Sequence, residues 1–328
     1  MLKTLKRNDI SSYIVLLVWA LLFRVYIFIH PNKTDLSSLD FSGSFASLSF
    51  LNHFFQTSPF LFVLVSFIIQ IVFAIYLNFQ VNRQKFNSQK DVLTAFLYLL
   101  LTSFLPSLSV MSVPFFVSIF LMISFWIIVN YNHAKQDSAQ SFNIGILIGL
   151  ATFLYVPSIL FLFLFLFLLY QVHTYELKDF VAKLLGFFTP FVLFFAFAYL
   201  NDSFDTILSK INLNIHFPIT IDNKISTVVY LLSMGVLFAF SLISYYMNLM
   251  KYSTISKMKI QMNFLFLILA IFISLFHKEM PNSAILFIIP SFSILIRQTF
   301  HVGKEKMNNF TFWTLILFLI SFQWFIIR

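Results

Sequence analysis

The sequence predicts an all-α protein, a polytopic transmembrane helix bundle of about eleven helices that forms a single integral membrane domain over residues 1–328. Of the 328 residues, 60% are hydrophobic and only 10% are charged, and the mean hydropathy is +0.90. Soluble domains usually carry about 25% charged residues. Apolar runs recur from residue 12 to residue 327 without the apolar–polar alternation of transmembrane barrel strands. The backbone N–H and C=O groups in lipid must therefore be hydrogen-bonded within helices.

The first apolar run follows Lys3, Lys6 and Arg7, exceeds the length of a signal-peptide core and lacks a small-residue cleavage site, so we expect a retained helix. The run 143–155 is short: at 1.5 Å per residue it covers only about 20 Å of the roughly 30 Å of hydrocarbon. Neighbours must shield it, or it forms half of a re-entrant hairpin. The expected spans are 12–30, 59–82, 92–106, 113–131, 143–155, 157–173, 180–200, 226–250, 262–277, 283–298 and 309–327.

The basic residues predict the orientation of the bundle. With eleven spans and a cytoplasmic N-terminus, fifteen Lys and Arg residues fall on the inner side and five on the outer side. If residues 143–173 formed one kinked helix, eleven Lys and Arg residues would lie on the inner side and nine on the outer side. The positive-inside rule therefore favours two helices that turn near Pro157. We therefore expect a bacterial inner-membrane protein with a periplasmic C-terminus, in which the net charge of +9 reflects topology and not nucleic-acid binding.

Two outer segments are long enough to be more than turns. In residues 31–58, the polar stretch Pro31–Asp40 precedes apolar residues near helical spacing over Phe45–Phe55, which predicts an interfacial helix after the first span. Residues 201–225 form a second outer loop, rich in charged residues, before the C-terminal transmembrane helices of 226–328. Because the other loops are short, we expect any chemistry at the outer helix ends or inside the bundle.

Arg24 lies inside the first span, about six residues from its outer end. A central Arg costs roughly 2.5 to 3.5 kcal/mol on insertion scales, so its presence needs a reason. It either holds the phosphate of a lipid-linked substrate or pairs with an outer carboxylate, or its side chain snorkels to the headgroups.

Asp35 and Asp40 place two carboxylates in the first outer loop, close to the membrane. Partial burial raises the pKa of a carboxyl group, so either residue suits a general base acting on a sugar or protein hydroxyl. The alternative is a solvated turn in which Asp35 caps a short helix.

No cofactor is predicted. The chain has no cysteine, and the histidines on the outer side, His30, His53, His216 and His277, lack ligand spacing such as H-x-x-x-H, although a mixture of His and carboxylates suits zinc or manganese. Nucleotide-binding and hydrolase motifs are absent. The expected spans contain no carboxylate, which counts against an ion-coupled transporter.

The overall plan resembles the GT-C superfamily of membrane glycosyltransferases, which use polyprenyl-phosphate-linked sugars on the outer face. Members typically begin with a helix ending in Arg, an acidic outer loop and an interfacial helix, similar here to Leu22-Phe23-Arg24, then Asp35 or Asp40, then Phe45–Phe55. Paired helices joined by Pro-containing turns follow, and 104–114 is similar to such a turn. The likeness covers roughly residues 12–200, a GT-C-like module of 1–200.

The family's next hairpin often reads G-L-A-x-L-T-K-P, and residues 149–157 look like a variant in which Tyr155 and Val156 stand where Thr-Lys would fall. Family members also place paired acids with a nearby Tyr in the first outer loop, whereas this chain has isolated aspartates followed by Phe41. The resemblance implies that Asp35 or Asp40 is the catalytic base. It implies substrate binding by four residues, namely Arg24, Lys33, His53 and Tyr155.

Three functions compete. The first is glycosyl transfer from a polyprenyl-phosphate donor at the outer leaflet. The second is a non-catalytic membrane scaffold or accessory subunit of a larger cell-envelope complex, favoured by the missing lysine and the small loops. The third is transport of a lipid, which needs no ion-coupling acids. Membrane lipid, including polyprenyl phosphate, and membrane proteins are the expected partners.

Overall fold

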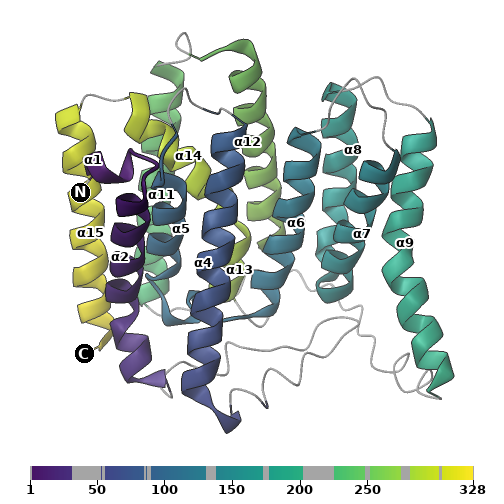
Figure 1. Cartoon of the computed structure of the whole chain (residues 1–328), viewed down its shortest axis with the longest axis horizontal. Helices are drawn as coiled ribbons and strands as arrows, with labels where there is room; N and C mark the ends of the chain where they lie inside the picture. The colour runs from purple at the N-terminus through teal and green to yellow at the C-terminus, as the bar shows by residue number, and fades with distance from the viewer. Residues whose placement is uncertain are drawn as a thin grey trace.

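The computed structural model describes residues 2–31, 53, 56–84, 86, 90–130, 138–172, 177–201, 225–247, 252–274, 281–302 and 305–327. These residues form helices and connecting turns and contain no strand, which confirms the all-α class. The helices stand side by side in a broad bundle, with α15 at one edge and α9 at the other (Figure 1). The long helices are α2 (Ile10–Ile29), α4 (Pro59–Arg83), α6 (Val113–Val129), α7 (Ser138–Leu154), α9 (Leu177–Leu200), α11 (Ile225–Met247), α12 (Thr254–Ser274) and α15 (Glu305–Ile327). The shorter elements are α1 (Leu2–Leu5), α5 (Leu93–Thr102), η3 (Pro106–Leu108), η4 (Val156–Ile159), α8 (Leu160–Val172), α13 (Pro281–Ala284), η6 (Ile285–Phe287) and α14 (Ile289–Val302).

Five helices in the described part of the chain are long and apolar enough to cross a membrane: α2, α4, α9, most of α11, and α12. Their exposed faces are rows of large apolar side chains, such as Leu185, Phe188 and Val192 on α9. An apolar outer surface suits a hydrocarbon solvent, so the chain is a helical membrane protein. The total of eleven spans stays a prediction.

Residues 138–172 form two helices and not one. α7 ends at Leu154, the 3₁₀ turn η4 contains Pro157, and α8 begins at Leu160, which confirms the turn predicted near Pro157. Proline favours the start of a helix because its missing N–H is not needed there.

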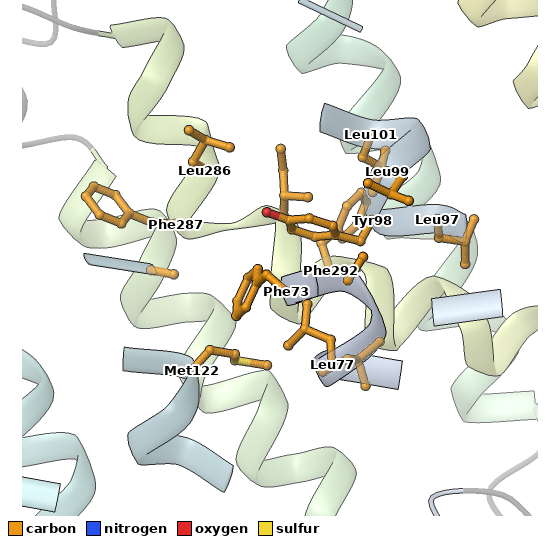
Figure 2. Close-up of a cluster of buried hydrophobic side chains, with 14 of the residues drawn as sticks. Phe73, Leu77, Leu97, Tyr98, Leu99, Leu101, Met122, Leu286, Phe287 and Phe292 are labelled. Atoms are coloured by element: carbon orange, nitrogen blue, oxygen red, sulfur yellow. The ribbon is translucent and has the colours of Figure 1, made fainter. Parts of the chain in front are cut away.

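The centre of the bundle is the short helix α5, in which all ten residues are buried. Ten residues rise only about 15 Å, so this helix depends on its neighbours for shielding. It packs against α2, α4 and α14. In Figure 2, the side chains of Phe73, Tyr98, Met122 and Phe292 converge from α4, α5, α6 and α14, and the rings of Phe73 and Tyr98 meet edge to face with centroids 5.4 Å apart.

Two predicted spans are interrupted. The helix expected over 92–106 ends at Thr102, because the residue before Pro106 is forced out of the helical region. The span expected over 283–298 consists of α13, η6 and α14, with a turn at Ile288. Irregular backbone at membrane depth is tolerated only inside protein or along a cavity. Consistent with this, η6 is fully buried.

Glycines bring α7 and α9 into backbone contact. A Cβ atom on Gly145 would lie 2.1 Å from the carbonyl oxygen of Lys183, and one on Gly186 would lie 2.2 Å from that of Phe142. A Cβ atom on Gly149, four residues after Gly145, would lie 2.5 Å from the carbonyl oxygen of Phe187 on α9. Small residues at this spacing let membrane helices pack closely.

Candidate functional site

Arg24 is buried in the bundle, with only 1% of its surface exposed. Its Nε donates to the Ser103 hydroxyl at 3.2 Å, and one terminal nitrogen donates to Gln70 Oε1 at 2.5 Å and to Thr102 Oγ1 at 2.8 Å. The guanidinium also lies over the Phe67 ring, 5.3 Å from its centroid. These contacts join α2 to α4 and to the end of α5. The snorkelling interpretation of Arg24 is therefore wrong.

The partners of Arg24 are held in place by the irregular segment after α5. The hydroxyl groups of Thr102 and Ser103 donate back to carbonyls one turn earlier in α5. Gln70 Nε2 donates to the carbonyl of Leu108 in η3, and the Met111 N–H donates to Ser66 Oγ on α4. Side chains of α4 thus satisfy backbone groups that the break in the helix leaves open, as a low-dielectric interior requires.

The positive charge of Arg24 is not neutralised by any carboxylate in the described part of the chain. Every hydrogen bond it makes there goes to a neutral oxygen. Its second terminal nitrogen is buried without a hydrogen-bond partner among the described residues, as is the hydroxyl group of Tyr98, which lies close enough to interact electrostatically with Arg24. An isolated buried cation is costly, so the unpaired nitrogen of Arg24 and the hydroxyl group of Tyr98 make this the candidate position for an anion.

The other predicted site residues do not gather around Arg24 in the described structure. His53 is exposed. Tyr155 precedes η4, where its hydroxyl group donates to the carbonyl of Ile273 at 3.1 Å and its ring stacks on Phe287. This places Tyr155 beside α12 and η6, away from α2. Asp35, Asp40, Lys33 and the predicted interfacial helix over 45–55 (save His53), with the outer loop 202–224, lie outside the described residues.

A second polar site, which the sequence did not reveal, lies at the opposite end of α5. The Asp91 carboxylate accepts hydrogen bonds from Arg297 Nε at 2.9 and 3.0 Å and from the Leu93 N–H at 3.1 Å, and it contacts the ring of His301. The amides of Asn78 and Asn82 donate to the Asp91 carbonyl. Arg297 is counted among the cytoplasmic cations in the sequence, yet both it and Asp91 are fully buried.

The charges at this second site compensate each other. Burial raises the pKa of Asp91, which precedes α5, but the Arg297 charge and the hydrogen bond from His301 outweigh burial and bring that pKa below its usual value. The pair joins α5 to α14, and the amides extend it to α4. Because the buried charges neutralise each other, this hydrogen-bonded ion pair needs no ligand, and we interpret it as a structural link between helices. The two residues are 206 positions apart, so no local sequence pattern indicated that they pair.

A second pair of opposite charges lies at the start of α9. Asp179 and Lys183 are four residues apart on the face that packs against α7, with exposures of 5% and 1%. The spacing of four residues places them one above the other on the helix. Asp91 and Asp179 are thus both buried directly before an expected span, although the expected spans themselves contain no carboxylate.

The arrangement defines a helical integral membrane protein in which, among the described residues, Arg24 is buried without a carboxylate partner and Arg297 is buried with one. A family model described as "Family of unknown function (DUF6427)" matches residues 32–328, and the chain belongs to this family. The matched range includes Gln70, Thr102 and Ser103 and begins after Arg24. Comparison with curated proteins and with solved structures gave no significant match.

Proposed function

We propose that this protein transfers a sugar from a polyprenyl-phosphate donor at the outer leaflet of a bacterial inner membrane, with Arg24 as the cation that binds the donor phosphate. The observation that supports this proposal is the burial of Arg24 among neutral oxygens, with one terminal nitrogen unpaired among the described residues. A phosphate would supply the missing negative charge. Arginine suits this role because its planar group presents several donors to an anion at once.

The position of Arg24 supports contact with the outer leaflet. The residue lies in the second half of α2 (Ile10–Ile29), and the charge bias of the loops predicts that this half faces the periplasm. The interrupted end of α5 lies at the same level, since Thr102 and Ser103 bond directly to Arg24. Both features fit a headgroup that enters the bundle from the outer side.

The reaction assigns separate tasks to the cation and the acids. The acceptor oxygen bonds to the anomeric carbon while the bond from that carbon to the phosphate oxygen breaks. Arg24 stabilises the charge that develops on the departing phosphate. Asp35 or Asp40, whichever serves as base, takes the proton from the acceptor hydroxyl. The GT-C resemblance supports this division of roles and stays part of the proposal.

The experiment uses the full chain in lipid nanodiscs with a radiolabelled polyprenyl-phosphate sugar. Binding of the donor is measured first, and release of labelled sugar onto membrane acceptors second. We expect Arg24→Lys to weaken donor binding by about tenfold or more, since a lysine loses the fork of donors. The double variant Asp35→Asn with Asp40→Asn should still bind the donor but lose transfer. Exposed Leu185→Ala on α9 serves as the control.

Donor binding that is the same in Arg24→Lys and in the unmodified chain would remove the phosphate-binding role. Transfer that survives in the double aspartate variant would remove the catalytic mechanism while leaving a lipid-binding protein.

A second function, a non-catalytic subunit of a cell-envelope complex, is favoured by a different observation. The hydrogen bonds of Arg24 bridge α2, α4 and α5, which is how a structural polar link is built. The exposed apolar face of α9 offers surface for a membrane partner. Purification in mild detergent distinguishes the two functions: stoichiometric partners support a subunit, and a chain that carries only polyprenyl lipid supports the enzyme.

A further inference from the structure

A cavity of about 460 Å³ lies between α5, α11, α14 and α15. These four helices form one end of the bundle in Figure 1. Its floor consists of buried residues that include Leu101 of α5, Phe104 just after α5, and Phe300 of α14. Tyr230 on α11 closes the wall by donating from its hydroxyl group to the Leu101 carbonyl at 3.2 Å. The volume falls within the range of about 300–1,000 Å³ typical of ligand sites.

The lining has no charge to offer a polar ligand. None of the described residues around the cavity is ionisable at neutral pH, and apart from Tyr230 the polar residues among them are serine and threonine. Their hydroxyl groups are already used, because Ser233 donates to Tyr230 and Thr299 to Ile296, each at 2.7 Å within its own helix. Thr311 and Thr314 on α15 do the same. An uncharged, saturated lining complements a hydrocarbon and excludes an anion.

The cavity reaches the lipid-facing surface. Val236 on α11 is 70% exposed, and Thr314 on α15 is also exposed, yet both border the cavity. Beside them on the same helices, Leu232 and Leu317 are 65% and 62% exposed. The cavity therefore opens sideways between α11 and α15, where the surrounding bilayer supplies hydrocarbon chains.

The cavity suits a single flexible chain better than a partner helix. An α-helix is about 10 Å across with its side chains and is rigid. A hydrocarbon chain is narrower and can bend to follow the lining. Among hydrocarbon chains, those of bilayer phospholipids are present at by far the highest concentration, which favours their binding by mass action.

We propose that this cavity holds one acyl chain of a bilayer phospholipid, inserted from the membrane between α11 and α15. Neither Arg24 nor its partners line the cavity, so the proposal does not rest on the sugar-transfer function. The bound acyl chain fills space between helices that otherwise meet mainly through side chains. One such contact is the ring of Phe312 of α15, which stacks on Phe96 of α5.

The test uses the full chain in nanodiscs made with a phospholipid that carries a photoactivatable diazirine in one acyl chain. Mass spectrometry of the digested protein then maps the adducts. We expect adducts on cavity residues of α15, such as Phe318, and Ser233→Phe to reduce them at least about fivefold by filling the space. Leu232→Phe, on the same helix but outside the cavity, is the matched control and should change them less than about twofold. Phe240→Ala, which enlarges the cavity, should increase them.

Adducts on the exposed face of α9 serve as the internal reference for correct folding and insertion. If Ser233→Phe keeps that reference and still gives unchanged labelling at Phe318, the cavity does not hold a chain and the proposal fails. It fails equally if equimolar polyprenyl phosphate displaces the labelled acyl chain, since the occupant is then an isoprenoid.

Discussion

Replacing Arg24 by methionine separates a functional charge from a structural one. Methionine retains most of the aliphatic volume of arginine but removes the charge and its donors. If Arg24 exists to bind an anion, the chain without ligand carries an unfavourable buried charge, and removing that charge should cost little stability. If Arg24 exists to hold α2, α4 and α5 together, the same change should be severe.

The structure sets the expected magnitude. Removing the charge recovers roughly 2.5 to 3.5 kcal/mol on insertion scales. Against this, Gln70 Oε1 loses its donor, which costs about 1–3 kcal/mol, and the contact with Phe67 is lost, about 0.5–2 kcal/mol. The hydroxyl groups of Thr102 and Ser103 keep their bonds to α5 carbonyls. The opposing terms nearly cancel, so Arg24→Met should lie within about 1 kcal/mol of the unmodified protein.

Arg24→Lys is the informative comparison, because it keeps the charge but loses the planar donor group. We expect it to be about 2 kcal/mol less stable than Arg24→Met. Thermal unfolding in detergent without added lipid measures both, at roughly 2 °C per kcal/mol for a protein of this size. A structural role predicts the reverse order, with Arg24→Met losing about 3–5 kcal/mol and Arg24→Lys less. That reversed order would refute the argument for an uncompensated functional cation.

Further predictions concern the ion pair and the glycine contacts. Asp91→Asn should destabilise the protein by about 3–5 kcal/mol in thermal unfolding, because Arg297 is left buried without its partner, and Asp91→Asn with Arg297→Met should recover part of the loss. The pKa of Asp91 is lower in the folded state than in the unfolded state, so its ionised form stabilises the fold above the unfolded pKa of about 3.9. This stabilisation is lost as the pH falls through the folded-state pKa. The melting temperature of the unmodified protein should therefore fall at low pH by an amount that Asp91→Asn does not show. Gly145→Ala should lower the melting temperature, because its Cβ meets the Lys183 carbonyl, whereas Gly235→Ala, with nothing within 4 Å, should be neutral or stabilising by up to about 1 kcal/mol.

Hydropathy predicted the helical class and most helix positions, because each membrane helix satisfies its own backbone and needs little from the rest of the chain. The turn near Pro157 followed from charge counting and is confirmed by η4. The breaks after Thr102 and at Ile288 were missed. An apolar run looks the same whether it forms one helix or a helix with a buried turn, and only the Pro106 signal was available for the first break.

Only part of the candidate site could be predicted from the sequence. Arg24 stood out because a charge in an apolar run is rare, but Gln70, Thr102 and Ser103 are common polar residues that nothing in the sequence links to it. The pair Asp91–Arg297 was missed for a similar reason, since Asp91 directly precedes one expected span and Arg297 lies one residue from the end of another, where charges are common. Long-range polar contacts depend on tertiary packing, which local sequence patterns do not encode.

The two buried arginines show what Arg24 lacks. Arg297 donates to a carboxylate at 2.9 Å, and the net charge of that site is cancelled by Asp91. Arg24 is as deeply buried, yet in the described part of the chain it meets only neutral oxygens. An anion that binds the folded protein and not the unfolded chain raises stability by mass action. Polyprenyl phosphate at about 100 times its dissociation constant should therefore add roughly 2.7 kcal/mol to the unmodified protein and nothing to Arg24→Met. Equal stabilisation of both proteins would place the phosphate elsewhere, and Arg24 would then require a different explanation from the one its unpaired nitrogen suggests.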